Sequence, residues 1–414
     1  MKYSKLFGKT LRQPPKDATT VNHRLLTQAG YVEQLMAGVY TYLPLGLRVL
    51  TNIARVVREE MNLIDAQEIL MPTLHPKANW EITKGWSNID VLFKLKSRTD
   101  KEYALGQSEE EVVTPLVKGR ISTYKDLPLC LYQIHWKYRD ELRAKSGILR
   151  GREFFMKDLY SFHDTQEDFQ RFYEIAKKTY LKIFKRLGLT AKVTEASGGG
   201  FSEKISYEFI VLTDAGEDTI LYCDSCDFCV NVDIAKLKLG DLCASCKKSK
   251  LKQAKGSEVG NVFDLGQKYC KDFDITITGR DGEKIHPIMG CYGIGISRIM
   301  GVIVEKYNDK NGILWPKEAT PYQMHLVGIG LDNKDILSKT HETYRKLQNK
   351  NVEILYDDRV DVSPGEKFAD ADLIGIPVRL VVSKKTGDKI EYKERDKEKT
   401  EMLSLEEVVK KVHV

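Results

Sequence analysis

The stretch YRDELRAKSGILRGREF, residues 138–154, contains four arginines and is the first place where the sequence suggests chemistry. Arginine presents a rigid fork of donors that stays charged, so clusters of arginine suit phosphates and carboxylates. Arg139 ends one predicted strand, and Arg150 and Arg152 begin the next, so all three can converge on one side of a hairpin. Glu141 could accept a hydrogen bond from an amino group such as that of adenine. The alternative is a surface hairpin held by ion pairs.

A second candidate group is the glycine-rich stretch GCYGIGISR, which ends at Arg298. Gly290, Gly293 and Gly295 would let the backbone approach a ligand closely. Arg298 falls in the first turn of the helix predicted to follow, where it could reach a phosphate. Phe154 offers an apolar face on which a purine could stack. The stretch matches neither the P-loop nor the dinucleotide fingerprint, but with the arginines it favours an acidic polyphosphate that carries a purine.

Periodicity predicts the elements that would position these residues. An amphipathic helix is expected at 46–62, and strands are expected at 131–139 and 153–163. A long helix should follow, because its aromatic residues recur at helical spacing. SGGGF at 197–201 is expected to be a hinge or a loop that approaches a ligand. Beyond Pro321 strands and helices alternate, which predicts a separate compact α/β domain.

Composition limits the class of protein. The chain has 414 residues, of which 42% are hydrophobic and 30% are charged, and its net charge is +6. This charge permits a polyanionic partner without requiring one. We find no apolar run that suits a signal peptide or a membrane span, so we expect a cytoplasmic location and no membrane partner.

Five of the eight cysteines lie between residues 223 and 246, which favours a metal over disulfides. Two C-x2-C pairs are separated by sixteen residues, as in structural zinc sites with four thiolates. The expected ligands are Cys223, Cys226, Cys243 and Cys246. Cys229 could replace Cys223 or Cys226, and the alternative is five thiols without a metal. Residues 235–255 also hold seven lysines and one acid, which form either a solvated surface or a contact with phosphates.

These stretches resemble the class II aminoacyl-tRNA synthetases. Motif 1 of that class is similar to GLRVLTNIARVVREEMNLIDAQEILMP, motif 2 to YRDE followed by LRGREF, and motif 3 to GCYGIGISR. The chain also resembles the prolyl-tRNA synthetase family of bacterial type in four further stretches, LGQSEEEVVT, LPLCLYQIHWKYRDELR, REFFMKDLYSFH and EVGNVFDLG. Near the C-terminus, LYDDR and SPGEKFADADLIGIPVRLVV resemble the anticodon-binding domain of that family. The resemblance covers nearly the whole chain in the same order.

The resemblance implies an α+β catalytic domain with an antiparallel sheet, a small zinc-binding insert and a C-terminal α/β anticodon-binding domain. The expected bounds are 1–196 and 257–320 for the catalytic domain, 197–256 for the insert, and 321–414 for the anticodon-binding domain. A homodimer with motif 1 at its interface is expected. The implied activity joins L-proline to tRNA(Pro) through prolyl-adenylate, at the expense of ATP. The interval between motifs 2 and 3 is too short for the large editing domain usual in the family.

Carried over residue by residue, the resemblance assigns catalysis to Arg139, Glu141 and Arg298. Arg139 would bridge the α-phosphate of ATP and the carboxylate of proline, and Glu141 would recognise adenine. The expected ATP-binding residues are Arg139, Glu141, Arg150, Arg152, Phe154, Glu258 and Arg298. Among them Glu258 would position Mg²⁺, and Arg298 would pack on adenine or hold the γ-phosphate.

The expected proline-binding residues are Ser108, Glu110, Asp158, His163, Cys291 and Gly293, and the expected anticodon-binding residues are Asp358, Arg359 and Lys367. The chain departs from the family at Gln107 and Ser108, where proline and threonine are usual, and at Asn261, where many relatives carry histidine. Ser108 keeps the hydroxyl group, so a hydrogen bond to the substrate would survive. A nucleophilic role for Cys291 is disfavoured, because a glycine-flanked cysteine is more often a wall residue.

Two other functions remain open. A catalytically silent synthetase-like protein could bind tRNA or regulate translation, although the motif arginines, Glu141 and the glycine-rich turn are all present. A synthetase for threonine or glycine would share the class. Threonine enzymes usually carry a catalytic zinc bound by cysteine and histidine, and the pocket stretches here lack that pattern.

Overall fold

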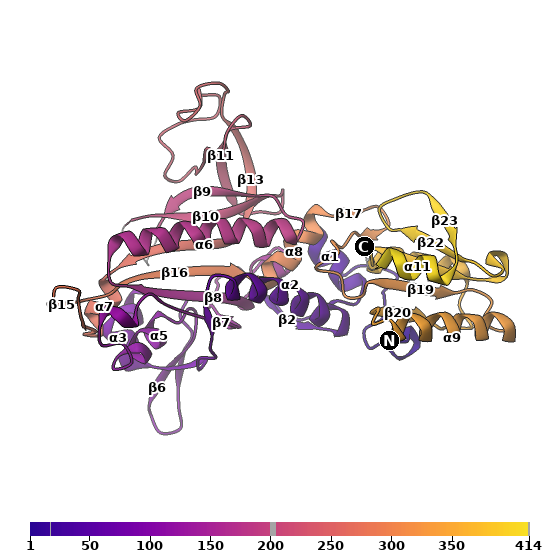
Figure 1. Ribbon diagram of the computed structural model, residues 1–414, viewed down its shortest axis with the longest axis horizontal. Coiled ribbons are helices and arrows are strands. Elements are labelled where there is room, and N and C mark those ends of the chain that lie inside the picture. Colours follow the sequence, from indigo (N-terminus) through magenta and orange to yellow (C-terminus); the bar gives the residue numbers. More distant parts are fainter. Residues whose placement is uncertain (17, 199–203, 413–414) are drawn as a thin grey trace. The chain divides into compact units, whose positions relative to one another are not determined.

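The computed structural model describes residues 1–16, 18–198 and 204–412 (Figure 1), so most of the predicted hinge at 197–201 lies outside it. Its contacts divide the chain into two compact units. The catalytic unit comprises residues 36–39 and 54–302, and the second unit comprises residues 1–35, 40–53 and 303–414. The expected catalytic bounds of 1–196 therefore include residues that pack with the C-terminal part of the chain. Within the described part of the chain, no helix has the length and hydropathy needed to cross a bilayer.

A nine-stranded sheet forms the centre of the catalytic unit, in the order β10-β9-β12-β11-β13-β16-β8-β7-β3. Most neighbours pair antiparallel, as expected, and the pairs β12–β9 and β3–β7 are parallel. The strands are β3 (Gln67–Glu68), β7 (Leu129–Tyr138), β8 (Glu153–His163), β9 (Ala191–Ser197), β10 (Ile205–Leu212), β11 (Asp218–Tyr222), β12 (Cys229–Asn231), β13 (Lys252–Gly266) and β16 (Ile288–Gly295).

Helices cover both faces of this sheet. The long helix α6 (Gln166–Arg186) runs across one face of the sheet (Figure 1). It buries the aromatic stripe seen in the sequence, including Phe169, Tyr180 and Phe184. On the other face, α5 (Glu110–Val117) and α7 (Lys268–Asp272) share a core with Tyr160 and Phe162 of β8. Side chains on this second face continue along β8 toward Phe154, and there they line a cavity.

Smaller elements complete the catalytic unit. Outside the central sheet it contains β4 (Leu74–Pro76), α3 (Lys77–Ile82), α4 (Gly85–Asn88), β5 (Lys94–Lys96), β6 (Glu102–Leu105), β14 (Ile277–Thr278) and β15 (Lys284–Ile285). The insert that carries the cysteine cluster begins after β11 and returns to the sheet as β13, and its loops extend beyond the ends of both strands (Figure 1). A hydrophobic cluster of its own surrounds the cysteines.

Two predicted helices and one hairpin that was not predicted lie at the sequence positions where one unit gives way to the other. The helix expected at 46–62 is α2 (Pro44–Asn62), and the helix expected after the glycine-rich strand is α8 (Ile296–Lys306). The hairpin of β1 (Val32–Met36) and β2 (Val39–Tyr42) was not predicted, because its strands are short and partly exposed.

The second unit contains the α/β domain that alternation predicted. Its sheet has the order β20-β19-β21-β22-β23, with parallel pairing among the first three strands and antiparallel pairing among the rest. Helices α9 and α11 share one core with this sheet, while α10 packs against residues that face the other way. The elements of this unit are α1 (Val21–Gln28), β17 (Asn308–Asp309), β18 (Gly312–Ile313), β19 (Met324–Gly328), α9 (Lys334–Asn349), β20 (Ile354–Asp357), α10 (Pro364–Ile374), β21 (Val378–Val382), β22 (Ile390–Glu394), β23 (Thr400–Leu403) and α11 (Leu405–Val412).

Gly375 ends α10 and generates a stability prediction. Its φ is +80°, and a Cβ there would lie 2.1 Å from the carbonyl oxygen of Ile313. Gly330 has a similar φ of +76°, but the nearest atom to its Cβ would be at an ordinary 3.5 Å. Gly330→Ala should therefore cost about 1–2 kcal/mol, the left-handed backbone penalty alone. Gly375→Ala should cost at least about 3 kcal/mol, because backbone must also move. Urea unfolding measures both values, and equal losses would contradict the expected clash.

Candidate active site

The predicted side chains meet because alternate residues on four neighbouring strands point to one face of the sheet. Gly293 pairs with Asp158 on one side and with Asn261 on the other, and Gly295 pairs with Met156. A cavity of about 280 Å³ lies on this face. Its walls include Arg139, Phe154, Met156, Glu208, Glu258, Asn261, Gly293, Gly295 and Arg298. Arg139, which follows β7, and Arg298, in the first turn of α8, thus line the same cavity.

Arg139 has a positive charge and an unused donor, which are the features that an anion would need. Its guanidinium lies over the ring of Phe154, 5.1 Å from the centroid. Its Nε is buried and has no hydrogen-bond partner among the described residues. Burial lowers the pKa of Arg139, and the nearby charge of Arg298 lowers it further. A buried cation with an unused donor is stabilised when a phosphate or carboxylate binds beside it.

Arg298 is held in place by the backbone. Its Nε donates to the carbonyl oxygen of Leu149 at 2.8 Å, and its Nη1 donates to that of Glu258 at 2.8 Å. The Glu258 carboxylate accepts from the Asn261 amide at 2.6 Å. Asn261, which replaces the usual histidine of the family, therefore orients the carboxylate that we expected to position Mg²⁺.

Two further carboxylates beside Glu258 escaped the sequence analysis. Burial, with repulsion from Glu258, raises the pKa of Glu208 to about 8 and that of Asp218 to about 6. One Glu208 carboxylate oxygen is buried without a partner in the described structure. The available signal was a lone glutamate within the apolar run SYEFIVL, which the sequence alone could not connect to a strand beside β13.

The loop of motif 2 is closed on itself in this structure. Arg150 donates to the Glu141 carboxylate through Nε and Nη2, at 3.0 and 2.7 Å, and to Glu217 at 2.6 Å. Arg152 donates to the carbonyl oxygens of Ala37 and Glu141. The residues expected to bind adenine and phosphates therefore satisfy one another, and a nucleotide would have to replace these contacts.

The residues expected around proline divide into two groups. Ser108, Glu110 and Cys291 are buried together, with the Cys291 thiol and the Ser108 hydroxyl group beside the Glu110 carboxyl group, but neither Glu110 oxygen makes a hydrogen bond of standard geometry with the described residues. Burial raises the pKa of Glu110 and strongly raises the pKa of Cys291, so the thiol stays protonated and a nucleophilic role is disfavoured. Asp158 is also buried, but Lys137, Gln133 and Tyr160 already surround its carboxylate.

The structure does not bring His163 to this group. His163 lies five residues beyond Asp158 on β8, so its side chain points to the opposite face of the sheet. There its Nδ1 is 2.6 Å from Asp168 of α6, and its ring packs against Phe169 and Phe172. His163 is part of the core beneath α6, and we do not include it in the proposed site.

The three residues expected to bind the anticodon are largely engaged within the second unit. Asp358 accepts from the backbone and hydroxyl group of Ser4. Arg359 pairs with Asp357 and Asp370. Lys367 is 2% exposed and donates to the carbonyl oxygens of Gly328 and Arg359. These contacts hold the loop that follows β20, and direct contact with tRNA stays a prediction for all three.

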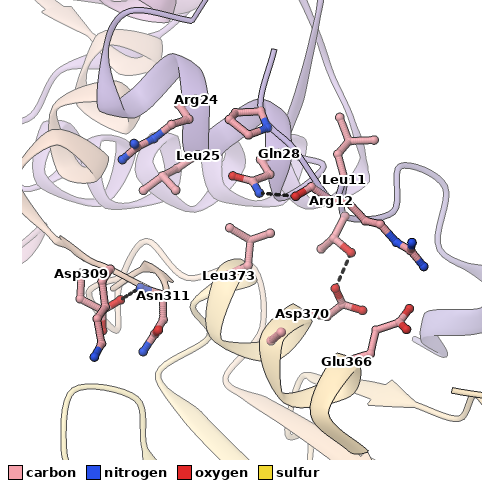
Figure 2. Close-up of a pocket in the computed structure, with 14 residues that line it drawn as sticks. Leu11, Arg12, Arg24, Leu25, Gln28, Asp309, Asn311, Glu366, Asp370 and Leu373 are labelled. Atoms are coloured by element: carbon pink, nitrogen blue, oxygen red, sulfur yellow. Dashed lines mark hydrogen bonds between the residues drawn. The ribbon is translucent and has the colours of Figure 1, made fainter. Parts of the chain in front are cut away.

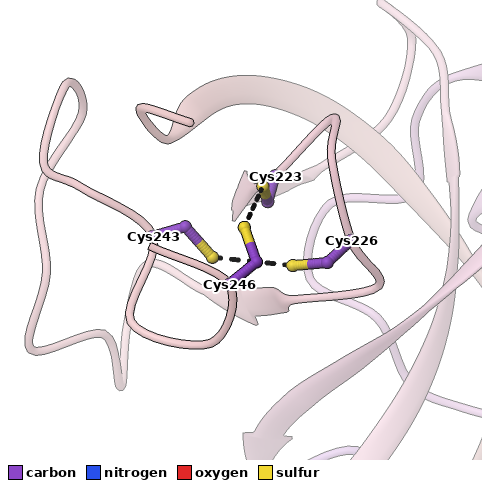
Figure 3. A group of neighbouring side chains, drawn as sticks. All are labelled: Cys223, Cys226, Cys243 and Cys246. Carbon is purple, nitrogen blue, oxygen red and sulfur yellow. Dashed lines mark hydrogen bonds between the residues drawn. The ribbon is translucent and has the colours of Figure 1, made fainter. Parts of the chain in front are cut away.

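The four cysteines of the two C-x2-C pairs converge as their spacing predicts (Figure 3). All four sulfurs lie within 4.8 Å of one another. Cys223 and Cys246 are 3.7 Å apart at Sγ, and Cys226 and Cys243 are 3.6 Å apart. Tetrahedral zinc with bonds of about 2.3 Å would separate its sulfurs by about 3.8 Å. Cys229 instead lies 3.2 Å from the Thr194 hydroxyl, outside the tetrad.

A larger groove of about 730 Å³ lies in the second unit, between α1 and α10 (Figure 2). Its walls mix both signs of charge, including Arg12, Arg24, Asp309 and Glu366. Thr10 donates to Asp370 across one side. None of the residues expected to do chemistry line it, so size alone does not make it the active site.

Comparisons with known proteins show which family the chain belongs to. Residues 93–307 match the class II tRNA synthetase core domain (G, H, P, S and T), and residues 323–414 match an anticodon binding domain. The chain is 37% identical to a proline–tRNA ligase of Wolbachia sp. subsp. Brugia malayi, over 99% of both chains. It is 38% identical to that of Ehrlichia ruminantium, over 98% of both. This chain belongs to the proline–tRNA ligase family.

Members of the family differ in length. The alignment with the Thermosipho africanus proline–tRNA ligase, at 33% identity, runs over 547 positions. At least 133 of these have no counterpart among the 414 residues of this chain. The Wolbachia and Ehrlichia alignments run over 422 and 423 positions. The length of this chain therefore matches that of the short relatives, which fits the expected lack of a large editing insertion.

Solved structures confirm the fold. The prolyl-tRNA synthetase of Cryptosporidium parvum, solved with L-proline and AMP, has a TM-score of 0.76 at 17% identity and matches 95% of this chain and 76% of its own. The prolyl-tRNA synthetase of Giardia lamblia, in complex with prolyl-adenylate, has a TM-score of 0.78 at 20% identity, with 94% and 75% matched.

The position of His163 generates a prediction for the site. His163→Gln should lower the free energy of unfolding by about 2–3 kcal/mol, because a packed buried side chain loses its partner. The KM for proline should stay within about twofold of the parent value, since the side chain faces α6. Steady-state kinetics and urea unfolding test both statements. A selective rise in the KM for proline would return His163 to the pocket.

Proposed function

We propose that this protein is a proline–tRNA ligase, which activates L-proline with ATP to form prolyl-adenylate and transfers the prolyl group to the 3′ end of tRNA(Pro). The observation that carries the proposal is the match to curated proline–tRNA ligases over nearly the full length of both chains. The cavity supports it, because Arg139, whose buried Nε is an unused donor, lines it with Phe154 and the glycine-rich strand. A silent paralogue has no specific observation in its favour.

In the proposed reaction, a carboxylate oxygen of proline attacks the α-phosphorus of ATP, and the bond to the pyrophosphate oxygen breaks. Arg139 would neutralise charge on the α-phosphate and align the carboxylate. No protein nucleophile is needed, so positioning and charge stabilisation supply the acceleration. Arg150 would exchange Glu141 for phosphate oxygens, which would leave Glu141 to accept from the adenine amine. Glu110 would accept from the ring ammonium of proline.

Mg²⁺ would accompany the nucleotide near Glu258. Hard oxygen ligands suit this ion, and Glu208 and Asp218 add two carboxyl groups whose pKa values are raised by burial and by repulsion from Glu258. Glu258, Glu208 and Asp218 are therefore the candidates to hold it. When bound, the ion would neutralise phosphate charge.

Pyrophosphate exchange tests the function. Among the twenty amino acids, proline should drive ATP–pyrophosphate exchange best. Arg139→Ala should reduce this exchange by about 100- to 1000-fold, since a charge-assisted contact to the transition state is lost. Arg120→Ala, at an exposed arginine that donates to a backbone carbonyl, is the control and should exchange normally. Best exchange with another amino acid would refute proline as the substrate, and a fully active Arg139→Ala would refute the role of Arg139.

We also assign a structural Zn²⁺ to Cys223, Cys226, Cys243 and Cys246. The set of four thiols and the spacing of their sulfurs fit the ion. Four protein ligands leave no open position, so the ion would fold the insert and not catalyse hydrolysis.

Metal analysis tests the zinc assignment. Protein purified without chelators should contain about one zinc per chain by elemental analysis. Cys243→Ser should lose the metal and destabilise the insert, because a three-thiolate site binds more weakly. Cys229→Ser should keep the metal, since Cys229 contacts Thr194 outside the tetrad. Zinc-free parent protein, or loss of zinc in Cys229→Ser alone, would overturn the assignment.

The remaining partners follow from the same proposal. tRNA(Pro) would contact the anticodon-binding domain and the seven lysines of 235–255, all of which are exposed. A second copy would complete a homodimer near β3, where Leu63 and Leu70 are 70% and 74% exposed. The expected cytoplasmic location stays a prediction.

A further inference from the structure

The hydroxyl group of Tyr160 connects the proline pocket to a buried ionic network. Tyr160 lies on β8, on the same face of the sheet as Asp158, and is completely buried. Its hydroxyl group donates to Asp158 Oδ2 at 3.1 Å and accepts from the Glu109 backbone N–H at 2.8 Å. The Ser108 hydroxyl oxygen lies 3.2 Å from the same phenol oxygen. Ser108 is one of the residues proposed to contact proline, whereas Tyr160 itself lies behind it.

The direction of these hydrogen bonds follows from Asp158. Lys137 Nζ lies 3.1 Å from Asp158 Oδ1 and 3.0 Å from Glu109 Oε1, so the carboxylate is paired with a buried cation. Gln133 Nε2 donates to Asp158 Oδ2 at 3.2 Å. The orientation of this amide is determined, because its oxygen accepts from the Met71 N–H at 2.9 Å. With the Lys137 ammonium beside Oδ1 and the Gln133 amide donating to Oδ2, Asp158 is an acceptor, and the Tyr160 hydroxyl group donates to it.

A phenol has one proton to donate. Since Tyr160 donates to Asp158, the contact between Tyr160 and Ser108 requires that Ser108 be the donor. The serine proton then lies on the phenol oxygen of Tyr160, and the lone pairs of the serine oxygen remain as acceptors. Glu110 adds acceptors, because neither of its carboxylate oxygens makes a hydrogen bond of standard geometry in the described part of the chain. The pocket thus presents two separate acceptor groups.

We propose that Tyr160 is a positioning residue that makes Ser108 a hydrogen-bond acceptor for the ring ammonium of proline. The inference rests on the proposed function, because it takes proline as the substrate. The secondary ammonium of proline carries two N–H donors, which match the two acceptor groups Ser108 and Glu110. Tyr160 thereby acts on the chemical selectivity of the pocket without touching the substrate.

Ser108 needs this orientation more than a threonine would. The threonine usual in the family has a second group on Cβ that restricts rotation about χ1, whereas serine rotates more freely. In this chain the hydrogen bond from Ser108 to Tyr160 supplies the restriction. Removal of the phenol oxygen would free the serine proton to turn toward the ligand, and Ser108 would then be able to donate.

The test compares two ligands that differ in one ring atom. In (S)-tetrahydrofuran-2-carboxylate an ether oxygen replaces the ammonium of proline, so this analogue needs a donor where proline needs an acceptor. Tyr160→Phe should raise the KM for proline in pyrophosphate exchange about tenfold, equivalent to about 1.4 kcal/mol. The KM for ATP should change less than twofold. The inhibition constant of the ether analogue should stay the same or fall, because Ser108 can now donate to it.

Two controls separate this effect from general damage. Tyr292→Phe removes another buried phenol oxygen, which bonds Ser161 at 2.9 Å and packs against α6 residues Phe172 and Tyr173. It should lower stability without changing either ligand constant. A double-mutant cycle with Ser108→Ala tests whether Tyr160 acts through Ser108. Tyr160→Phe should then change the KM for proline less than twofold in the Ser108→Ala background.

Three results would overturn the inference. One is an equal weakening of proline and the ether analogue by Tyr160→Phe. Another is a tenfold effect of Tyr160→Phe that persists in the Ser108→Ala background, and the third is no effect of Tyr160→Phe on proline. Failure of the parent enzyme to use proline at all would instead refute the proposed function, so the two failures are distinguishable.

Discussion

In the antiparallel ladder of β7, β8 and β16, every second side chain points to the same face, and the whole active site depends on this register. Gln133 pairs with Asp158, which in turn pairs with Gly293. A slip of one residue in β8 would turn Asp158 and Tyr160 toward α6 and turn Lys157 and Ser161 toward the cavity. The buried pairing of Lys137 with Asp158 and Glu109 opposes such a slip, because it would leave charges unpaired in the core.

Much of this arrangement is readable in the sequence, and the bounds of β8 agree with the expected strand at 153–163. Arg139 and Arg298 also reach one cavity, as their positions at strand and helix ends suggested. The sequence could not show that the His163 side chain points toward α6. Helices cover both faces of the sheet, so the run LYSFH is buried throughout and shows no alternation of polar and apolar residues.

The polar network around Tyr160 could not be predicted from the sequence either. Its members come from β7, β8 and the residues before α5, and each taken alone reads as an ordinary residue of a strand or loop. The direction of the hydrogen bonds around Asp158 depends on the contact between Met71 and Gln133. Only the tertiary structure shows this contact. The cysteine tetrad could be predicted because metal ligands follow a short sequence spacing, and the metal would stabilise an insert whose own apolar cluster is small.

The closed motif 2 loop has a consequence for how charge is handled on nucleotide binding. Arg150 is already neutralised by Glu141 and Glu217 before any ligand arrives. The arrival of a triphosphate is therefore a partner exchange, in which phosphate oxygens replace carboxylates at the same guanidinium. The number of ion pairs around Arg150 is conserved across such an exchange. Its contribution to affinity is then the small difference between two similar contacts, while Arg139, with its unused donor, contributes a newly formed one.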